Sequence, residues 1–195
     1  MTRPRAVLFD LDGTLTEPLL DFPRIKADMG IGDAPILEAL AAMAGPDRAR
    51  AEAVLNRHER DAAGRATLNP GCGELLAWLA GAGIGVGIVT RNSRASLERV
   101  VAEHGLPASV LISRDCCPPK PDPQPLLEGC RRLGTTVEQT WFVGDGVYDV
   151  QAAANAGMRC IWLSHGEPRP FPEVPWREVN SLPATLALLQ AARVG

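Results

Sequence analysis

The sequence has no cluster of basic residues and no long uncharged stretch, and these two absences narrow its partners. Its 20 Lys and Arg oppose 23 Asp and Glu, giving a formal net charge of -3. Nucleic-acid binding relies on concentrated positive charge, so we expect no nucleic-acid partner. The longest uncharged run, residues 75–90, contains four glycines and is shorter than the roughly 20 residues of a membrane-spanning helix. We therefore expect no membrane segment.

Cysteine and histidine are too few and too poorly spaced for a disulfide framework or a zinc site. The five cysteines are an odd number, two of them adjacent, and the three histidines are far apart. A structural zinc site would need paired Cys or His residues at ligand spacing. We expect reduced thiols, no signal peptide and a cytoplasmic location. The cysteines are Cys72, Cys116, Cys117, Cys130 and Cys160.

The sequence has enough hydrophobic residues to form a substantial core, since they make up 46% of its 195 residues. From residue 70 onward, apolar and often β-branched runs alternate with amphipathic helical patterns. This alternation predicts an α/β fold, a parallel sheet with helices on both faces. The expected strands are residues 7–9, 84–89, 110–112, 140–143 and 160–163, and the expected helices are residues 73–80, 93–104, 123–133, 148–156 and a last one after Ser181.

The alternation is interrupted between the first and second expected strands. Residues 16–65 contain no convincing strand and much alanine, with helical patterns at 34–44 and 47–63. We expect these residues to form a small helical cap, inserted into a core made of residues 1–15 and 66–195. Charged residues of the second helix, Glu59 among them, fall mostly off its apolar face. For the arginines among them, a solvated face is the default explanation and a contact with substrate the alternative.

Polar residues follow four of the expected strands, where ligands bind in open α/β sheets. A hydroxyl, an ammonium and three or four carboxylates should therefore meet at one edge. Two carboxylates as close as the first pair raise each other's pKa unless a cation lies between them, although they could also begin a solvated turn. In chain order the residues are Asp10 and Asp12, then Thr90, Arg91 and Asn92, then Lys120, then Asp145 and Asp149.

The order D-x-D-G-T, a strand ending in Thr, a Lys, and G-D-x-x-x-D resembles the haloacid dehalogenase superfamily. The closest resemblance is to its phosphoglycolate-phosphatase-like branch, which has a Rossmann-like core and a small helical cap. It implies a Mg²⁺-dependent phosphatase that acts on a small phosphorylated metabolite through an aspartyl-phosphate. Asp10 would be the nucleophile and Asp12 the acid and base. The implied Mg²⁺ ligands are Asp10, Asp145 and the backbone carbonyl of Asp12.

The resemblance also implies that Thr90 and Lys120 bind phosphate oxygens. Arg91 and Asn92 are further candidates for substrate contact, although Asn92 could equally cap the helix that follows. Asp149 could order a metal-bound water or cap its own helix. In the cap, Arg24, Lys26 and Arg57 are candidates for binding a carboxylate or a second phosphate of the substrate.

Two other functions share these motifs. A phosphosugar mutase uses the same aspartyl-phosphate but must exclude water, and a non-catalytic binding protein could keep the fold without turnover. The intact set of motif residues argues against the second. Halide release is disfavoured, because that chemistry needs neither a carboxylate at the position of Asp12 nor a metal. The sequence predicts neither the substrate nor the oligomeric state.

Overall fold

The computed structural model describes residues 2–192 and contains a six-stranded, fully parallel sheet in the order β3-β2-β1-β4-β5-β6. The predicted α/β fold class is confirmed, and five strands match the predicted ones within one residue at each end. The sixth strand was not predicted, because its sequence Arg-Glu-Val has no apolar run. The strands are β1 (Ala6–Phe9), β2 (Gly85–Val89), β3 (Val110–Ile112), β4 (Thr140–Gly144), β5 (Arg159–Leu163) and β6 (Arg177–Val179).

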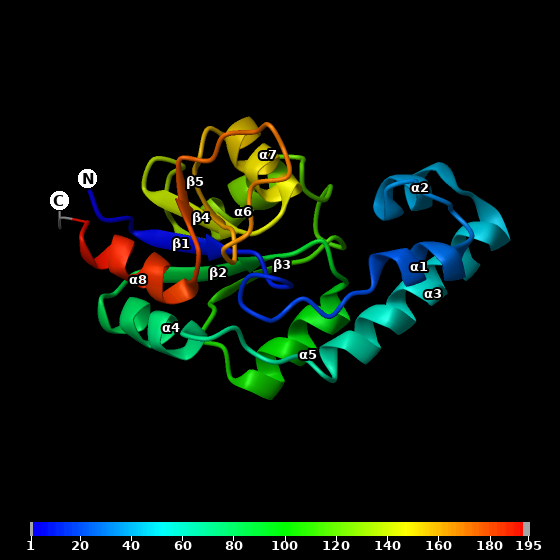
Figure 1. The fold of residues 1–195 in the computed structure, drawn as a ribbon, viewed down its shortest axis with the longest axis horizontal. Helices are drawn as coiled ribbons and strands as arrows, with labels where there is room; N and C mark the ends of the chain where they lie inside the picture. The colour runs from blue at the N-terminus through cyan, green and yellow to red at the C-terminus, as the bar shows by residue number, and fades with distance from the viewer. Residues whose placement is uncertain (1, 193–195) are drawn as a thin grey trace.

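Helices cover both faces of the sheet (Figure 1), because side chains alternate along the central strand β1. Leu8 packs on one face with residues of α6 and α7, whereas Val7 and Phe9 pack on the other with residues of α4, α5 and α8. All three side chains are fully buried. Burying each contributes roughly 1.5–3 kcal/mol. The helices are α4 (Cys72–Gly81), α5 (Arg94–His104), α6 (Gln124–Leu133), α7 (Val147–Ala156) and α8 (Leu182–Gln190).

The strand order reverses beside β1, and this position locates the ligand-binding edge. The chain passes from β1 to β2 and β3 on one side, and then returns to β4 on the other side. Ligands of open α/β sheets bind at the carboxyl ends of the strands at such a switch point. The backbone N–H of Asp10 donates to the carbonyl of Val143 at 2.9 Å, so the motifs that follow β1 and β4 lie side by side.

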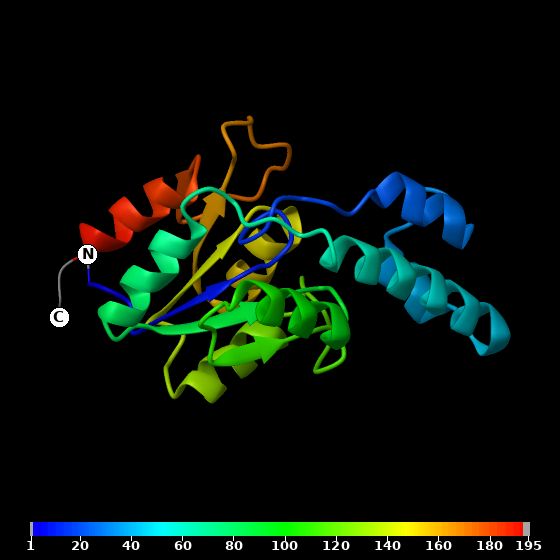
Figure 2. The same ribbon diagram turned by 90° about the horizontal axis from the view of Figure 1, so that it is seen from below.

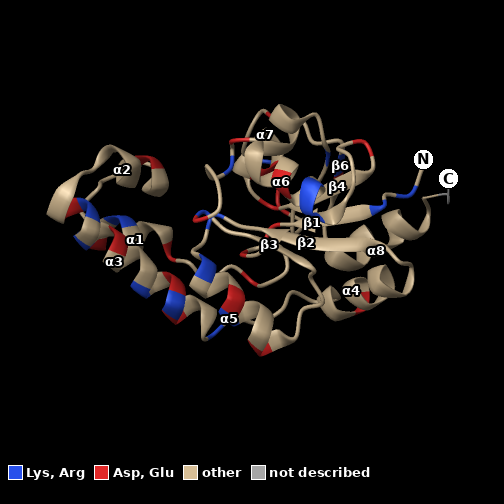
Figure 3. Ribbon diagram, turned by 180° about the vertical axis from the view of Figure 1, so that it is seen from behind, with Lys and Arg blue, Asp and Glu red and all other residues tan. Residues whose placement is uncertain are grey.

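Three further helices form a unit that extends away from the carboxyl edge of the sheet (Figures 1 and 2). This three-helix unit consists of α1 (Phe22–Met29), α2 (Ile36–Ala42) and α3 (Gly45–Ala63). It has a hydrophobic cluster of its own, made of Ile25, Met29, Leu40, Ala51 and Leu55. Lys, Arg, Asp and Glu alternate along α3 and α5 and do not gather in one patch (Figure 3).

Helix α1 was not predicted from the sequence, although its start carries two signals. The carboxylate of Asp21 accepts the backbone N–H of Arg24 at 3.0 Å, and Pro23 lies in the first turn. The helix has only eight residues, of which Ile25 and Met29 are buried, so its apolar periodicity is weak. No helix within residues 2–192 is long and apolar enough to cross a membrane.

Candidate active site

Lys120 lies at the centre of the candidate site and is 2% exposed. Its ammonium donates to Asp10 Oδ1 at 2.6 Å, to Asp149 Oδ1 at 2.5 Å and to the carbonyl of Val89 at 3.0 Å. An ammonium has three N–H donors, and all three are used. Burial acts to lower the pKa of Lys120, but the two carboxylates outweigh it, and the pKa is raised. Lys120 is therefore a fixed positive charge.

Two carboxylates accept from this ammonium, and a third lies beside them. Asp10, Asp145 and Asp149 each place one oxygen within 4.8 Å of the others. Burial raises the pKa of Asp10 well above its usual range, against the opposing effect of Lys120. Burial and the charge of Asp149 raise the pKa of Asp145 to about 6. One ammonium leaves this group with excess negative charge, and oxygen ligands of this kind suit a hard divalent cation.

The turn after Asp12 allows Asp145 to approach β1. Gly13 has a φ of +87°, and a Cβ added there would lie 2.3 Å from Asp145 Oδ2. The hydroxyl of Thr14 donates to Asp145 Oδ1 at 2.8 Å and holds this carboxylate in place. The carbonyl of Gly13 is also within hydrogen-bond distance of His165 Nε2, at 2.6 Å. Position 13 thus requires glycine for two reasons: its backbone has a positive φ, and Asp145 occupies the space that a Cβ would fill.

The structure shows one of the two roles that the sequence left open for Asp149, the cap of its own helix. One oxygen accepts the backbone N–H of Gly146 at 2.9 Å, which caps the start of α7, while the other accepts from Lys120. Gly144 permits this arrangement, because a Cβ on Gly144 would lie 2.5 Å from Asp149 Cβ. Whether Asp149 orders a metal-bound water stays a prediction.

Asp12 lies apart from the three carboxylates. Its side chain accepts the backbone N–H of Leu19 at 3.4 Å. Burial raises the pKa of Asp12 to about 6; the Leu19 hydrogen bond opposes this shift and the charge of Glu59 adds to it. Such a pKa suits proton exchange near neutral pH. The predicted metal contact of Asp12 uses its backbone carbonyl, and it stays a prediction.

The segment after β2 forms another wall of the site. Thr90 is 5% exposed, and its hydroxyl accepts the backbone N–H of Asn92 at 3.1 Å. Ser93, not Asn92, is the N-cap residue of α5, so the predicted capping alternative for Asn92 is wrong. Arg91 donates to the carbonyl of Lys120, and its guanidinium lies 4.1 Å from the centre of the Tyr148 ring.

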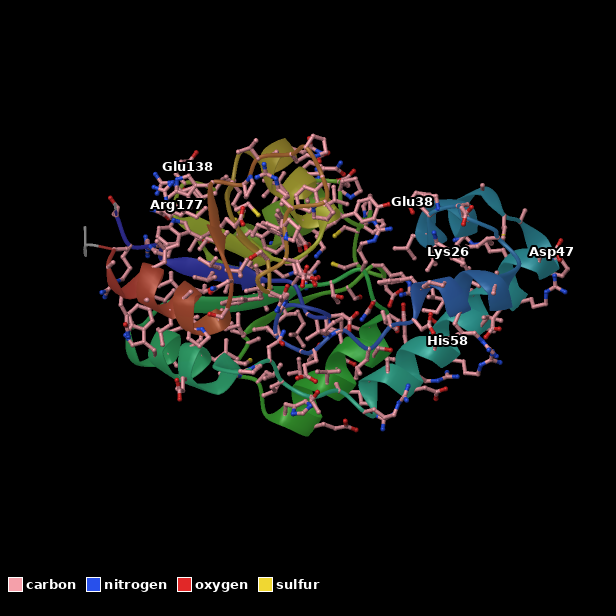
Figure 4. All side chains as sticks on the ribbon, viewed as in Figure 1. Lys26, Glu38, Asp47, His58, Glu138 and Arg177 are labelled. Carbon is pink, nitrogen blue, oxygen red and sulfur yellow. The ribbon has the colours of Figure 1, made fainter. Side chains whose placement is uncertain are left out.

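Arg91 also connects the sheet to the three-helix unit. Its Nη2 lies 3.1 Å from both carboxylate oxygens of Glu38 in α2. In Figure 4, Glu38 lies on the side of the unit that faces the sheet, whereas Asp47 lies at the far tip. Arg91 and Glu38 thus form an ion pair between the two parts of the molecule.

A second, buried ion pair joins the same two parts. Glu59 of α3 is 3% exposed; it pairs with Arg114 and accepts the backbone N–H of Ser93 at 3.0 Å. Arg114 also donates to Asn56 Oδ1 at 2.7 Å. Glu59 is therefore buried, although the sequence places it mostly off the apolar face of its helix. No sequence signal identified it, since its partner is 55 residues away.

These residues enclose a cavity of about 460 Å³ between the sheet edge and the three-helix unit. Lys26 lines this cavity, whereas Arg24 and Arg57 approach Asp28 at 3.1 and 3.9 Å and do not line it. The cavity thus brings together seven of the residues predicted for catalysis, phosphate or substrate binding and metal binding. They are Asp10, Asp12, Thr90, Arg91, Asn92, Lys120 and Asp145.

Comparisons with known proteins show which family the sequence matches. A family model described as "Hydrolase: haloacid dehalogenase-like hydrolase" matches residues 23–157. N-acetylmuramic acid 6-phosphate phosphatase of Pseudomonas putida is 32% identical over 188 residues, covering 84% of each chain. The plasmid-encoded phosphoglycolate phosphatase of Cupriavidus necator is 33% identical over 218 residues, covering 97% of this chain and 94% of its own.

Solved structures share the whole fold at lower identity. A hydrolase from Pseudomonas syringae has a TM-score of 0.80 at 17% identity, covering 96% of this chain and 99% of its own. CbbY from Rhodobacter sphaeroides in complex with phosphate has a TM-score of 0.70 at 22% identity, covering 91% and 94%. These structures support the fold alone. Because the family model spans more than half of the sequence and close relatives match along most of it, the chain belongs to the haloacid dehalogenase-like hydrolase family.

Proposed function

We propose that this protein is a Mg²⁺-dependent phosphatase that hydrolyses a small phosphomonoester through an aspartyl-phosphate. The observation that carries the proposal is the buried carboxylate of Asp10, which meets the Lys120 ammonium and two further carboxylates in one cavity. Membership of a hydrolase family, with relatives named as phosphatases of small metabolites, supports the reaction class. The proposal includes a cytoplasmic location, where the five free cysteines would stay reduced.

The proposed roles account for how a carboxylate can attack a negatively charged phosphate. A phosphate monoester is a dianion, and two unit charges 4 Å apart repel by about 4 kcal/mol at an effective dielectric of 20. Mg²⁺, held by Asp10, Asp145 and the carbonyl of Asp12, would offset this repulsion. Lys120 fixes the direction of the Asp10 carboxylate and adds positive charge beside the phosphate. The hydroxyl of Thr90 already accepts one N–H, so its proton is available to a phosphate oxygen.

The two catalytic roles fall to two carboxylates: Asp10 attacks phosphorus and Asp12 transfers protons. An Asp10 oxygen forms a bond to phosphorus while the bond to the leaving oxygen breaks, and Asp12 gives that oxygen its proton. Asp12 next takes a proton from the water that attacks phosphorus, which releases inorganic phosphate and restores Asp10. The separation of Asp12 from the carboxylate cluster supports this division. Arg91 and Asn92 are proposed to contact the substrate as part of the cavity wall.

We further propose that residues 16–65, which contain the three-helix unit, act as a cap on a core made of residues 1–15 and 66–195. The separate hydrophobic cluster of the unit and its share of the cavity lining support this division. A cap in this position excludes water and contacts the part of the substrate that is not phosphate.

Hydrolysis of an aryl phosphate tests the proposed function. We expect activity with Mg²⁺ and none in excess chelator. Asp10→Asn should abolish turnover, and Asp12→Asn should lower kcat by roughly 10²–10⁴-fold, the usual contribution of general acid–base catalysis. Labelled phosphate should remain on the wild-type chain after an acid quench and be absent from Asp10→Asn. Full activity in chelator would refute the metal role, and a requirement for a bisphosphate activator would indicate a mutase.

A further inference from the structure

The wall of the cavity that faces away from the carboxylates is apolar. The three-helix unit and the segment leading into it supply this wall, which the sequence did not predict. Leu55 is 3% exposed and belongs to the hydrophobic cluster of the unit, whereas Phe22 is 51% exposed at the start of α1. The apolar residues lining the cavity here are Pro18, Leu20, Phe22, Pro35, Ile36, Leu37 and Leu55.

Two of the three cations that line the cavity are paired with carboxylates. Lys120 is held by two carboxylates, and Arg91 by both oxygens of Glu38. Lys26, in the three-helix unit, donates to the backbone carbonyl of Asp33 at 2.9 Å, an uncharged partner that leaves two of its N–H donors for other acceptors. Among the described residues of the lining, no other Lys or Arg occurs. A carboxylate on the substrate would therefore have one ammonium without a counter-charge to approach, that of Lys26, and would otherwise lose its hydration against the apolar wall, which disfavours binding.

We infer that the preferred substrates are phosphomonoesters whose non-phosphate part is an apolar group of several carbons, rather than phosphate esters of small hydroxy acids. This inference rests on the proposed function, because it assigns the phosphate to the carboxylate end of the cavity. A volume of about 460 Å³ leaves room for such a group beside the phosphate. Binding would remove the apolar group and the apolar wall from water together.

A chain-length series tests the inference directly. The substrates are the n-alkyl phosphates from methyl to hexyl, with 2-phosphoglycolate as the charged comparison, all assayed with Mg²⁺. Each buried methylene should raise kcat/KM by about 4-fold until the cavity is filled. Hexyl phosphate should be preferred over 2-phosphoglycolate. A flat series, or a preference for 2-phosphoglycolate, would overturn the inference.

Two variants on one helix provide a matched comparison. Phe22→Ser makes the apolar wall polar, and the half-exposed position of Phe22 lets the variant fold. This variant should show a smaller rise in kcat/KM for each added methylene. Arg24→Ala changes an exposed residue of the same helix that does not line the cavity, and it should leave the gain per methylene unchanged. Equal gains in the two variants would contradict the role of the wall.

Binding of n-alkylphosphonates, which cannot be hydrolysed at the P–C bond, separates this inference from the proposed function. Calorimetry with Mg²⁺ should show affinity that rises with chain length, and phosphonoacetate should bind more weakly than an alkylphosphonate of similar size. If no ester is hydrolysed, the proposed function fails, yet this measurement still decides the inference. Affinity that does not depend on chain length would overturn it.

Discussion

Lys120 shows how a single residue can organise the charge of a site. Its ammonium is a compact charge with three donors, and Asp10, Asp149 and the carbonyl of Val89 each accept one. The planar guanidinium of an arginine could not reach these three acceptors in the same way. With three carboxylates to one ammonium, the remaining negative charge is available to a divalent cation.

The close contact between Gly13 and Asp145 gives a prediction about metal affinity. Gly13→Ala should weaken Mg²⁺ binding by roughly 10–100-fold, as expected when the support of a metal ligand is lost. The added Cβ would lie 2.3 Å from Asp145 Oδ2, so the carboxylate must move. The free energy of unfolding should also fall by more than about 1 kcal/mol, because a φ of +87° disfavours alanine. Calorimetric titration with Mg²⁺ and urea unfolding measure the two effects.

Gly73→Ala is the matched control for this prediction. A Cβ at Gly73, in α4, would meet no atom within 4 Å. Alanine favours a helix over glycine, so the variant should be as stable as the wild type or slightly more so, with unchanged Mg²⁺ affinity. If both substitutions alter Mg²⁺ binding equally, the contact with Asp145 is not the cause.

Single residues were predictable where they follow a strand and unpredictable where they depend on a distant partner. Asp10, Thr90, Lys120 and Asp145 follow β strands or the loops after them, and the shared edge of a parallel sheet brings them together. The burial of Glu59 depends on Arg114, which lies in another part of the fold. A charged residue in a helix resembles a solvated one until its partner is known.

At the scale of elements, the contact between α1 and α3 predicts a pH dependence of stability. Asp28 of α1 lies 2.8 Å from His58 Nε2, and this hydrogen bond, together with Arg24, lowers the pKa of Asp28 below its usual 3.8. A lowered pKa in the folded state stabilises the protein above the unfolded pKa, and this contribution is lost as pH falls through the folded pKa. Asp28→Asn should therefore lower the Tm near neutral pH, and the difference should disappear in acid.

Thermal unfolding of both proteins across a pH series measures this difference. Asp47→Asn is the control, because Asp47 forms only an exposed 3.5 Å pair with Arg50 at the far tip of the unit. It should have little effect at any pH. A Tm difference for Asp28→Asn that stays constant down to strong acid would show that its carboxylate is not stabilised by folding.

The two ion pairs between the three-helix unit and the sheet should differ in strength. Glu59→Gln leaves Arg114 buried without its counter-charge, which should cost about 3–5 kcal/mol in the free energy of unfolding. Glu38→Gln changes a pair in which the side chains of Arg91 and Glu38 are 20% and 45% exposed. That change should cost only about 0.2–1 kcal/mol. Urea unfolding of the two variants compares them, and equal costs would contradict the difference in burial.

The helices and strands with many apolar residues were predicted from the sequence, whereas those with few were not. Five buried strands were recognisable from β-branched and other apolar runs, whereas β6 has two exposed charged residues in its three positions. Helices α2 and α3 fall within the predicted patterns, extended by two residues at the start of α3, while α1 is too short to show a clear periodicity. Short elements at an edge are defined by their neighbours more than by their own sequence.

At the scale of the whole molecule, the site lies between the sheet edge, which could be predicted from the sequence, and the three-helix unit, whose position could not. The resemblance to a hydrolase superfamily was confirmed, and it covers the sheet edge where the charged residues meet. The shape and lining of the cavity depend on how the three-helix unit is held by Glu38 and Glu59, and no sequence pattern encodes that arrangement. Reaction class could therefore be predicted, whereas the apolar wall could not.

The central position of β1 also affects how the protein is made. Ala6 lies beside Gly85 on one side and Thr140 on the other, so the ribosome synthesises β1 long before either neighbour. At about 5–20 residues per second, β4 emerges on the order of ten seconds after β1, and until then this apolar strand has at most β2 to pair with. During that interval the nascent chain exposes an aggregation-prone segment that a chaperone could bind. Asp10 and Asp145 meet only after this wait, so an incomplete chain carries no assembled carboxylate cluster.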